Sequence, residues 1–194
     1  MKKSLKIFFI LIVAIFVVWL FNEKVDAREV YNSDIEYEEN SDGEIVVYKT
    51  NYKVKNVEIP SMIDGKVVTE IGSYGFSHCE ELEMISLPNT IRKINEGAFY
   101  ACKSIKTINI PESVNKMGHS AFEDCFSLEN VNMSSNIEII ELNVFRGCVS
   151  LKEINISNNV NQIKNYAFRE CKELKKISLL GVEHILSEAF EGCS

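Results

Sequence analysis

Six cysteines are the residues of this chain whose chemistry most needs an explanation. They stand at positions 79, 102, 125, 148, 171 and 193, at successive spacings of 23, 23, 23, 23 and 22 residues. Cysteines can form disulfides, bind a metal ion or act as nucleophiles, and an even number in an exported chain favours disulfides. The constant spacing favours another interpretation, because residues that recur at one period occupy equivalent places in a repeated unit.

Stacked repeats place equivalent residues about 4.7–4.9 Å apart with parallel side chains. A disulfide needs its two Cβ atoms roughly 3.5–4.5 Å apart and angled toward each other. A zinc site needs ligands that converge on one point, whereas this column spreads them along an axis. We therefore predict a structural ladder of buried, reduced thiols that act as small hydrophobic residues. Its members are Cys79, Cys102, Cys125, Cys148, Cys171 and Cys193.

Other chemistry-bearing patterns are weak. His78, His119 and His184 occupy three different repeat positions, so no triad or ligand cluster recurs. An acidic run at 28–44 fails as a calcium loop, since Glu38 replaces the leading Asp and Lys49 stands where a bidentate Glu belongs. The net charge of −7 argues against nucleic acid as a partner. We expect no enzyme activity, no cofactor and no metal site.

Phenylalanine and aliphatic residues recur at the same period as the cysteines. Each unit reads F-x-x-C-x-x-L-x-x-I-x-L, and its second half alternates as a short strand with one buried face does. The A-F-x-x-C-x-x-L half spaces its apolar residues as a short helical turn of α or 3₁₀ type would. One unit cannot bury its apolar face alone, but stacked units can, so the pattern predicts a solenoid. The phenylalanines stand at positions 76, 99, 122, 145, 168 and 190.

These repeats resemble the bacterial BspA-like (Treponema-type) leucine-rich repeat. The units "IGSYGFSHCEELEMISLPNTIRK" (71–93) and "INEGAFYACKSIKTINIPESVNK" (94–116) carry the resemblance most fully, and it covers about 57–194. It implies an α/β (mainly β) leucine-rich-repeat solenoid of 23-residue repeats, each a short strand plus a short helical turn. It also implies an exported or cell-surface protein that binds other proteins or host surfaces, without fixing a ligand.

Residues 1–27 form a predicted export segment. Lys2, Lys3 and Lys6 precede an apolar run from Ile7 to Phe21, whose 15 residues suit a signal peptide better than a bilayer span. Small residues before position 28 allow cleavage after Ala27. The alternative is an uncleaved anchor, in which residues 7–21 contact the membrane. Both interpretations export the rest of the chain, because the basic end stays inside.

The remaining chain divides into a cap and the repeats. Residues 28–56 are expected to be an acidic leader and a small β N-terminal cap, with a hairpin turn at Asp42-Gly43. Residues 57–194 are expected to be the solenoid, whose last repeat is incomplete. That end is expected to stay uncovered, to pack on a partner, or to mark a truncated copy of a longer surface protein.

The candidate binding surface is a strip of strand side chains that alternate with the buried ones and so point outward. Asn is a poor strand residue, yet it recurs at 109, 132 and 155. Two explanations stay open: an amide ladder that holds the coils together, or a polar surface for an unidentified protein or glycan. We call these ten residues the outward strip: Met84, Ser86, Thr107, Asn109, Asn130, Asn132, Glu153, Asn155, Lys176 and Ser178.

The function expected from these features is that of an exported, adhesin-like binding module that is secreted or held at the cell surface. The alternative is a membrane-anchored structural scaffold, or a remnant of a longer surface protein. The oligomeric state has no signal in the sequence.

Export gives the first testable prediction. Because a basic, then apolar, then Val-x-Ala order ends at Ala27, N-terminal sequencing of the secreted protein should begin at Arg28. Recovery of the intact Met1 end in the membrane fraction would instead support the anchor.

Overall fold

A computed structural model describes residues 35–49 and 51–193. The predicted export segment 1–27 and the start of the predicted leader, residues 28–34, lie outside the described residues. The part of the chain from Asp34 onward forms one compact unit.

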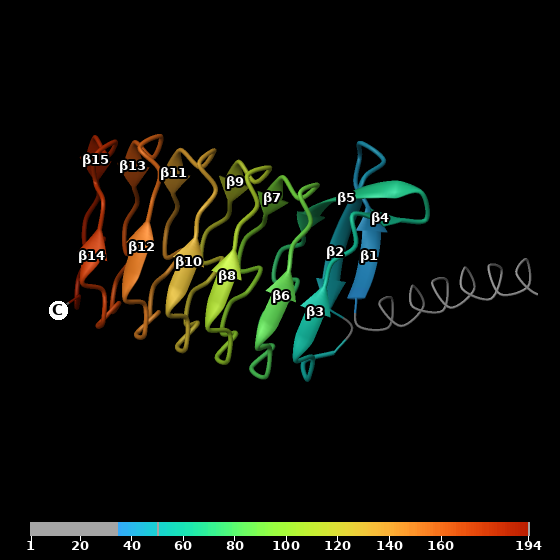
Figure 1. The fold of residues 1–194 in the computed structure, drawn as a ribbon, viewed down its shortest axis with the longest axis horizontal. Coiled ribbons are helices and arrows are strands. Elements are labelled where there is room, and N and C mark those ends of the chain that lie inside the picture. The colour runs from blue at the N-terminus through green and yellow to red at the C-terminus, as the bar shows by residue number, and fades with distance from the viewer. Residues whose placement is uncertain (1–34, 50, 194) are drawn as a thin grey trace, which may run out of the picture. The chain divides into compact units, whose positions relative to one another are not determined.

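The chain winds into stacked coils, each of which contributes one short strand to each of two rows (Figure 1). The alternating apolar pattern explains these strands, because one face of each is buried and the other is exposed. The front row contains β3 (Asn56–Glu58), β6 (Met84–Ser86), β8 (Thr107–Asn109), β10 (Asn130–Asn132), β12 (Glu153–Asn155) and β14 (Lys176–Ile177). The rear row contains β5 (Lys66–Ile71), β7 (Lys93–Ile94), β9 (Lys116–Met117), β11 (Ile139–Ile140), β13 (Gln162–Ile163) and β15 (His184–Ile185).

Strands of successive coils pair in parallel and in the register that the 23-residue period predicts, from β8 to β14 in the front row and from β5 to β9 and β11 to β15 in the rear row. In the front row, Asn132 lies opposite Asn109 on one side and Asn155 on the other. In the rear row, Lys93 lies opposite Lys116. The predicted solenoid is confirmed as a mainly β structure.

The core lies between the two rows and the third side of each coil. Phe76, Phe99, Phe122, Phe145 and Phe168 are fully buried. Their rings stack along the axis together with Phe190, with centroids 5.1–5.7 Å apart and planes within 6–19° of parallel. Aromatic pairs at this separation contribute about 0.5–1.5 kcal/mol beyond the area they bury.

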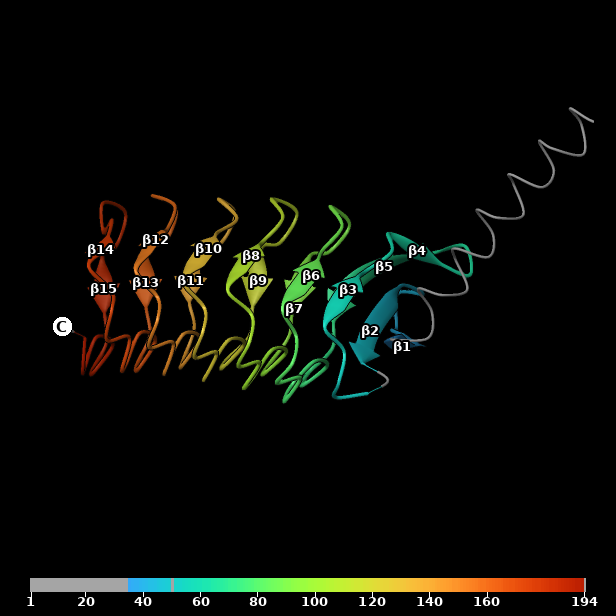
Figure 2. The same ribbon diagram turned by 60° about the horizontal axis from the view of Figure 1, so that its bottom comes forward.

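The sequence predicts a short helical turn on the third side of each coil. The structure has single turns there instead, which line the lower edge in Figure 2 and lie at 73–78, 96–101, 119–124, 142–147, 165–170 and 187–192. We call these the turn segments. Tyr100 N–H donates to Gly97 C=O (2.9 Å), a bond of the 3₁₀ type. The neighbouring Phe99 N–H donates to Ala121 of the next coil (2.8 Å). No helix forms in the described residues, because every second N–H of these segments bonds along the axis.

This alternation forces two residues of each turn segment into the left-handed region. Ala101 and Asp124, for example, have φ values of 56° and 58°. Gly97 (φ 56°) occupies the other such place in its coil, and the Tyr74 ring lies so close that a Cβ on Gly97 would be 2.4 Å from it. A side chain at 97 would thus meet both backbone strain and a clash.

Two hairpins form the N-terminal end. The first, β1 (Ile35–Glu39) with β2 (Ile45–Lys49), confirms the predicted Asp42-Gly43 turn. In the second, β4 (Met62–Ile63) pairs with β5 across Asp64-Gly65. Both turn residues have positive φ (50° and 78°), as a two-residue type I′ turn requires. Because β2 pairs with β5, the first hairpin continues the rear row.

Two later coils have serine in place of the turn prolines at 88 and 111, and the serine hydroxyl forms hydrogen bonds within the turn, whereas the last coil has Leu180 at this position. Ser134 Oγ accepts the N–H of Asn136 (3.1 Å) and donates to Val114 C=O (2.6 Å). Ser157 Oγ likewise accepts the N–H of Asn159 (3.1 Å). A serine side chain can build such a turn without the fixed φ of proline.

The phenylalanine stack gives a second prediction. Phe122→Ala should lower the free energy of unfolding by about 3–5 kcal/mol, because it removes a buried ring with a stacked ring on each side. Urea unfolding followed by circular dichroism measures the loss. The matched control is Phe190→Ala, whose ring is partly buried and stacks on Phe168 alone among the described residues. An equal loss in both variants would contradict the stack as the main source of stability.

Candidate functional site

The cysteine ladder is the most regular polar feature of the core. Cys102, Cys125, Cys148 and Cys171 are buried free thiols, and each Sγ donates to the phenylalanine carbonyl of the preceding coil at 3.1 Å. Cys193, which is partly exposed, does the same toward Phe168. Cys79 instead reaches Asn51 C=O at 3.9 Å, because the coil before it lacks a turn segment.

Each of the phenylalanine carbonyls that accepts a thiol also accepts a hydrogen bond from a second donor. Phe99 C=O, for example, accepts the N–H of Cys102 in its own coil (3.2 Å) and the thiol of Cys125 in the next coil (3.1 Å). A carbonyl oxygen has two lone pairs, so both are used. The thiol is therefore a buried donor as well as a small apolar group.

Burial makes these thiols poor nucleophiles. Loss of solvation raises the pKa of Cys79 to about 11 and that of Cys125 to about 12. The same cause raises the pKa of Cys102, Cys148 and Cys171. It also raises the pKa of Cys193, which is less deeply buried. The thiolate is the reactive form, so a raised pKa keeps the ladder inert at neutral pH.

The histidines and carboxylates are dispersed. His119 Nδ1 lies 3.2 Å from Glu141, which also lies 3.4 Å from Lys164. His78 packs edge-on against Tyr100, and His184 is exposed. Among residues 35–49 and 51–193, no group of three or more His, Cys, Asp or Glu side chains could hold a metal ion.

The outward strip lies on the exposed face of the front row, where Figure 1 shows the strands side by side. Nine of its ten residues fall within β6, β8, β10, β12 and β14, and Ser178 follows the last of these strands. The middle residue of each three-residue strand is buried and its two neighbours are exposed. The structure therefore brings the predicted residues together on one surface.

The amide column of the strip is partly bonded. Asn132 Nδ2 donates to Asn109 Oδ1, whereas the side chain of Asn155 has no hydrogen-bond partner within the described part of the chain. At the C-terminal end of the strip, Lys176 Nζ lies 3.7 Å from Glu153, with both side chains at least half exposed. Such an exposed pair contributes little to stability.

Sequence reasoning missed two amides on the bend that follows the front row. Asn136 Nδ2 donates to Glu112 C=O (2.6 Å), and Asn159 Nδ2 donates to Ser135 C=O (2.8 Å), in each case one coil back. Their spacing of 23 residues was the available signal. We call Asn136 and Asn159 the bend amides.

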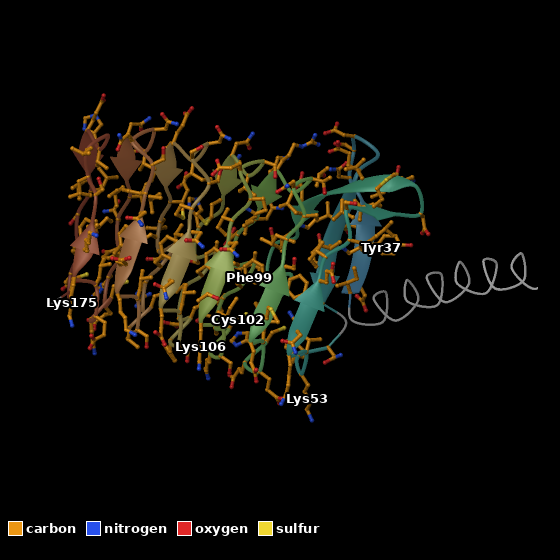
Figure 3. All side chains as sticks on the ribbon, in the orientation of Figure 1. Tyr37, Lys53, Phe99, Cys102, Lys106 and Lys175 are labelled. Carbon is orange, nitrogen blue, oxygen red and sulfur yellow. The ribbon has the colours of Figure 1, made fainter. Side chains whose placement is uncertain are left out.

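Figure 3 shows charged side chains along the lower edge, where Lys53, Lys106 and Lys175 are labelled. Lys106 and Lys175 directly precede the strip residues Thr107 and Lys176. Charge pairing continues near this edge, where Lys152 Nζ lies 2.5 Å from Glu129 and Lys103 Nζ lies 2.7 Å from Glu80. Charged side chains of both signs thus border the central part of the strip.

Comparison with protein families identifies the repeat. Residues 69–194 match the family described as BspA type Leucine rich repeat region, in six copies. The chain belongs to this family. A BspA-type repeat is a repeat of bacterial surface-protein type, and its leucine-rich-repeat fold is a binding scaffold that is not typically enzymatic.

A solved structure of a leucine-rich repeat protein from Eubacterium ventriosum shares the fold of this BspA-type chain. It is 21% identical with a TM-score of 0.64, over 84% of this chain and 50% of that one. The T. pallidum leucine rich repeat protein is also 21% identical, with a TM-score of 0.48 over 74% of this chain and 89% of its own. The chain thus spans half the length of the Eubacterium protein.

A comparison with curated proteins finds no match to this BspA-type chain. Within residues 35–49 and 51–193, no helix has the length and apolar character that crossing a bilayer requires.

The thiol ladder gives the third prediction. All six cysteines should be free, but in the native protein a thiol reagent should label Cys193 first, since it is the one partly exposed. Intact mass after alkylation in denaturant without reductant should show six labels. Fewer than six would mean that disulfides form.

Proposed function

We propose that this chain is an exported, non-catalytic binding module that presents its front row to a macromolecule outside the cell. The observation that carries the proposal is the outward strip, whose central part is a row of exposed, mainly polar side chains on the parallel strands β8, β10 and β12. The stacked phenylalanine core beneath it holds the strip in a fixed geometry. Preorganised side chains lose little entropy on binding.

The cell-surface part of the proposal has separate support. The family is of bacterial surface-protein type, and the basic and then apolar order of residues 1–27 favours export. Adhesion to a host or to another bacterium is the role that joins these two features. The ligand contacts are expected to come from several coils at once.

A structural scaffold is the second candidate. The hydrogen bond from Asn132 to Asn109 favours it, because this bond joins two coils within the strip itself. If the amide column serves only to hold the coils together, its loss will lower stability without an effect on binding by the protein that remains folded.

The fourth prediction separates these two roles. The triple change Asn109→Ser, Asn132→Ser and Asn155→Ser should weaken capture of the full chain on surfaces coated with host-cell or bacterial-surface extracts by at least tenfold. The melting temperature should change little, because the side chains are exposed and only one of the possible amide bonds in the column is formed.

The matched control is the double change Asn115→Ser and Asn161→Ser. These amides are also exposed, but they directly precede the rear-row strands β9 and β13. The control should retain capture. A fall of many degrees in the melting temperature of the triple variant, with capture unchanged on the folded fraction, would make the strip structural and place the binding site elsewhere.

A further inference from the structure

The centre of the outward strip carries a single charge. Across β8, β10 and β12 its exposed residues are Thr107, Asn109, Asn130, Asn132 and Asn155, with Glu153 as the single charge among the six. The whole chain carries 49 charged side chains, 21 basic and 28 acidic, and Lys106, Glu129 and Lys152 directly precede the strip residues Thr107, Asn130 and Glu153. The centre of the strip is therefore bordered by charges of both signs, but it consists mainly of amides and carries one carboxylate. The centre itself offers an anionic ligand no counter-charge.

Several of the amides near this centre are held in place by hydrogen bonds between coils. Asn132 Nδ2 bonds Asn109, and the bend amides Asn136 and Asn159 bond backbone carbonyls one coil back at 2.6 and 2.8 Å. Each carboxamide has two N–H donors and an oxygen with two lone pairs. One N–H is used in each of these bonds, so each amide keeps a donor and an acceptor in a fixed orientation at the exposed surface.

From β8 to β12 the strip lacks the residues that dominate protein–protein interfaces. Such interfaces are centred on buried Trp, Tyr, Phe, Met or Arg side chains. Met84, which is 60% exposed, is the large apolar member of the strip, and it lies on the N-terminal side of the amide-rich centre. A partner that needs an aromatic or apolar anchor finds none among the strip residues from Thr107 to Asn155.

Paired donors and acceptors without charge suit a ligand made of hydroxyl groups, since each hydroxyl both donates and accepts. The same groups recur in each coil, so one polymer can meet several equivalent contacts. Each contact is weak, but linked contacts add through a high effective concentration. An acidic polymer is disfavoured by the net charge of −7.

We propose that the outward strip and the bend amides bind a neutral polysaccharide chain that crosses several coils. This rests on the proposed function, because it names the class of ligand for the same surface. A protein ligand is the competing outcome of the test.

Affinity electrophoresis of the full chain tests the proposal. Native gels contain dextran, mannan or galactan as neutral polysaccharides, or hyaluronate as an anionic one. At least one neutral polysaccharide should retard the chain, and hyaluronate should not. The Asn109, Asn132 and Asn155 triple serine variant should lose at least tenfold in apparent affinity, while the Asn115 and Asn161 control should retain it. Absence of retardation in all three neutral gels, or equal retardation of the triple variant, would overturn the proposal.

A second arm separates this proposal from the proposed function. The coated extracts of the capture assay are treated either with periodate, which destroys sugar diols, or with protease. Capture that depends on the strip and disappears only after periodate supports the polysaccharide. Strip-dependent capture that survives periodate and disappears after protease overturns the polysaccharide while the binding module stands. Capture that never depends on the strip overturns both.

Discussion

The axial hydrogen bonds of the turn segments are the constraint on which this structure depends. Every second N–H there donates to the next coil, as Phe99 does to Ala121, and all of these bonds run in the same direction along the axis. The N–H groups between them close single turns within the coil. This arrangement leaves the phenylalanine carbonyl with one free lone pair, and the thiol of the next coil fills it. The repeated cysteine is explained by the need for a donor that is small and loses little when it leaves water.

The sequence was sufficient for the coil and its strands. The 23-residue columns of Phe, Cys and aliphatic residues predicted the buried side, and alternation predicted which side chains face outward. It was insufficient for the turn segments, because their apolar spacing is the same for a helical turn and for alternating turns. The residues with left-handed φ values also give no sequence signal for the turn segments. Ala101, Asp124 and Gly147 occupy the same position in successive coils, yet their side chains are chemically unrelated. The axial bonds impose that conformation whatever the side chain.

The candidate surface was predictable in position but not in detail. Alternation alone placed Asn109, Asn132 and Asn155 on the exposed face. Whether neighbouring amides bond each other depends on side-chain rotamers, and the structure bonds Asn132 to Asn109 without extending the ladder to Asn155. The bend amides were overlooked because serine, threonine and asparagine share that column, and such residues are usual in any turn.

The geometry of the repeat also determines how equivalent side chains are arranged along the molecule. A catalytic or metal site needs several different groups to converge within a few ångströms. A solenoid does the opposite, since it places the same group once per coil along a line. In the described residues, thiols, phenylalanines and amides each form a column. A repeated line of equal, weak contacts gains most from a ligand that is itself extended and repetitive, because the contacts then add along its length.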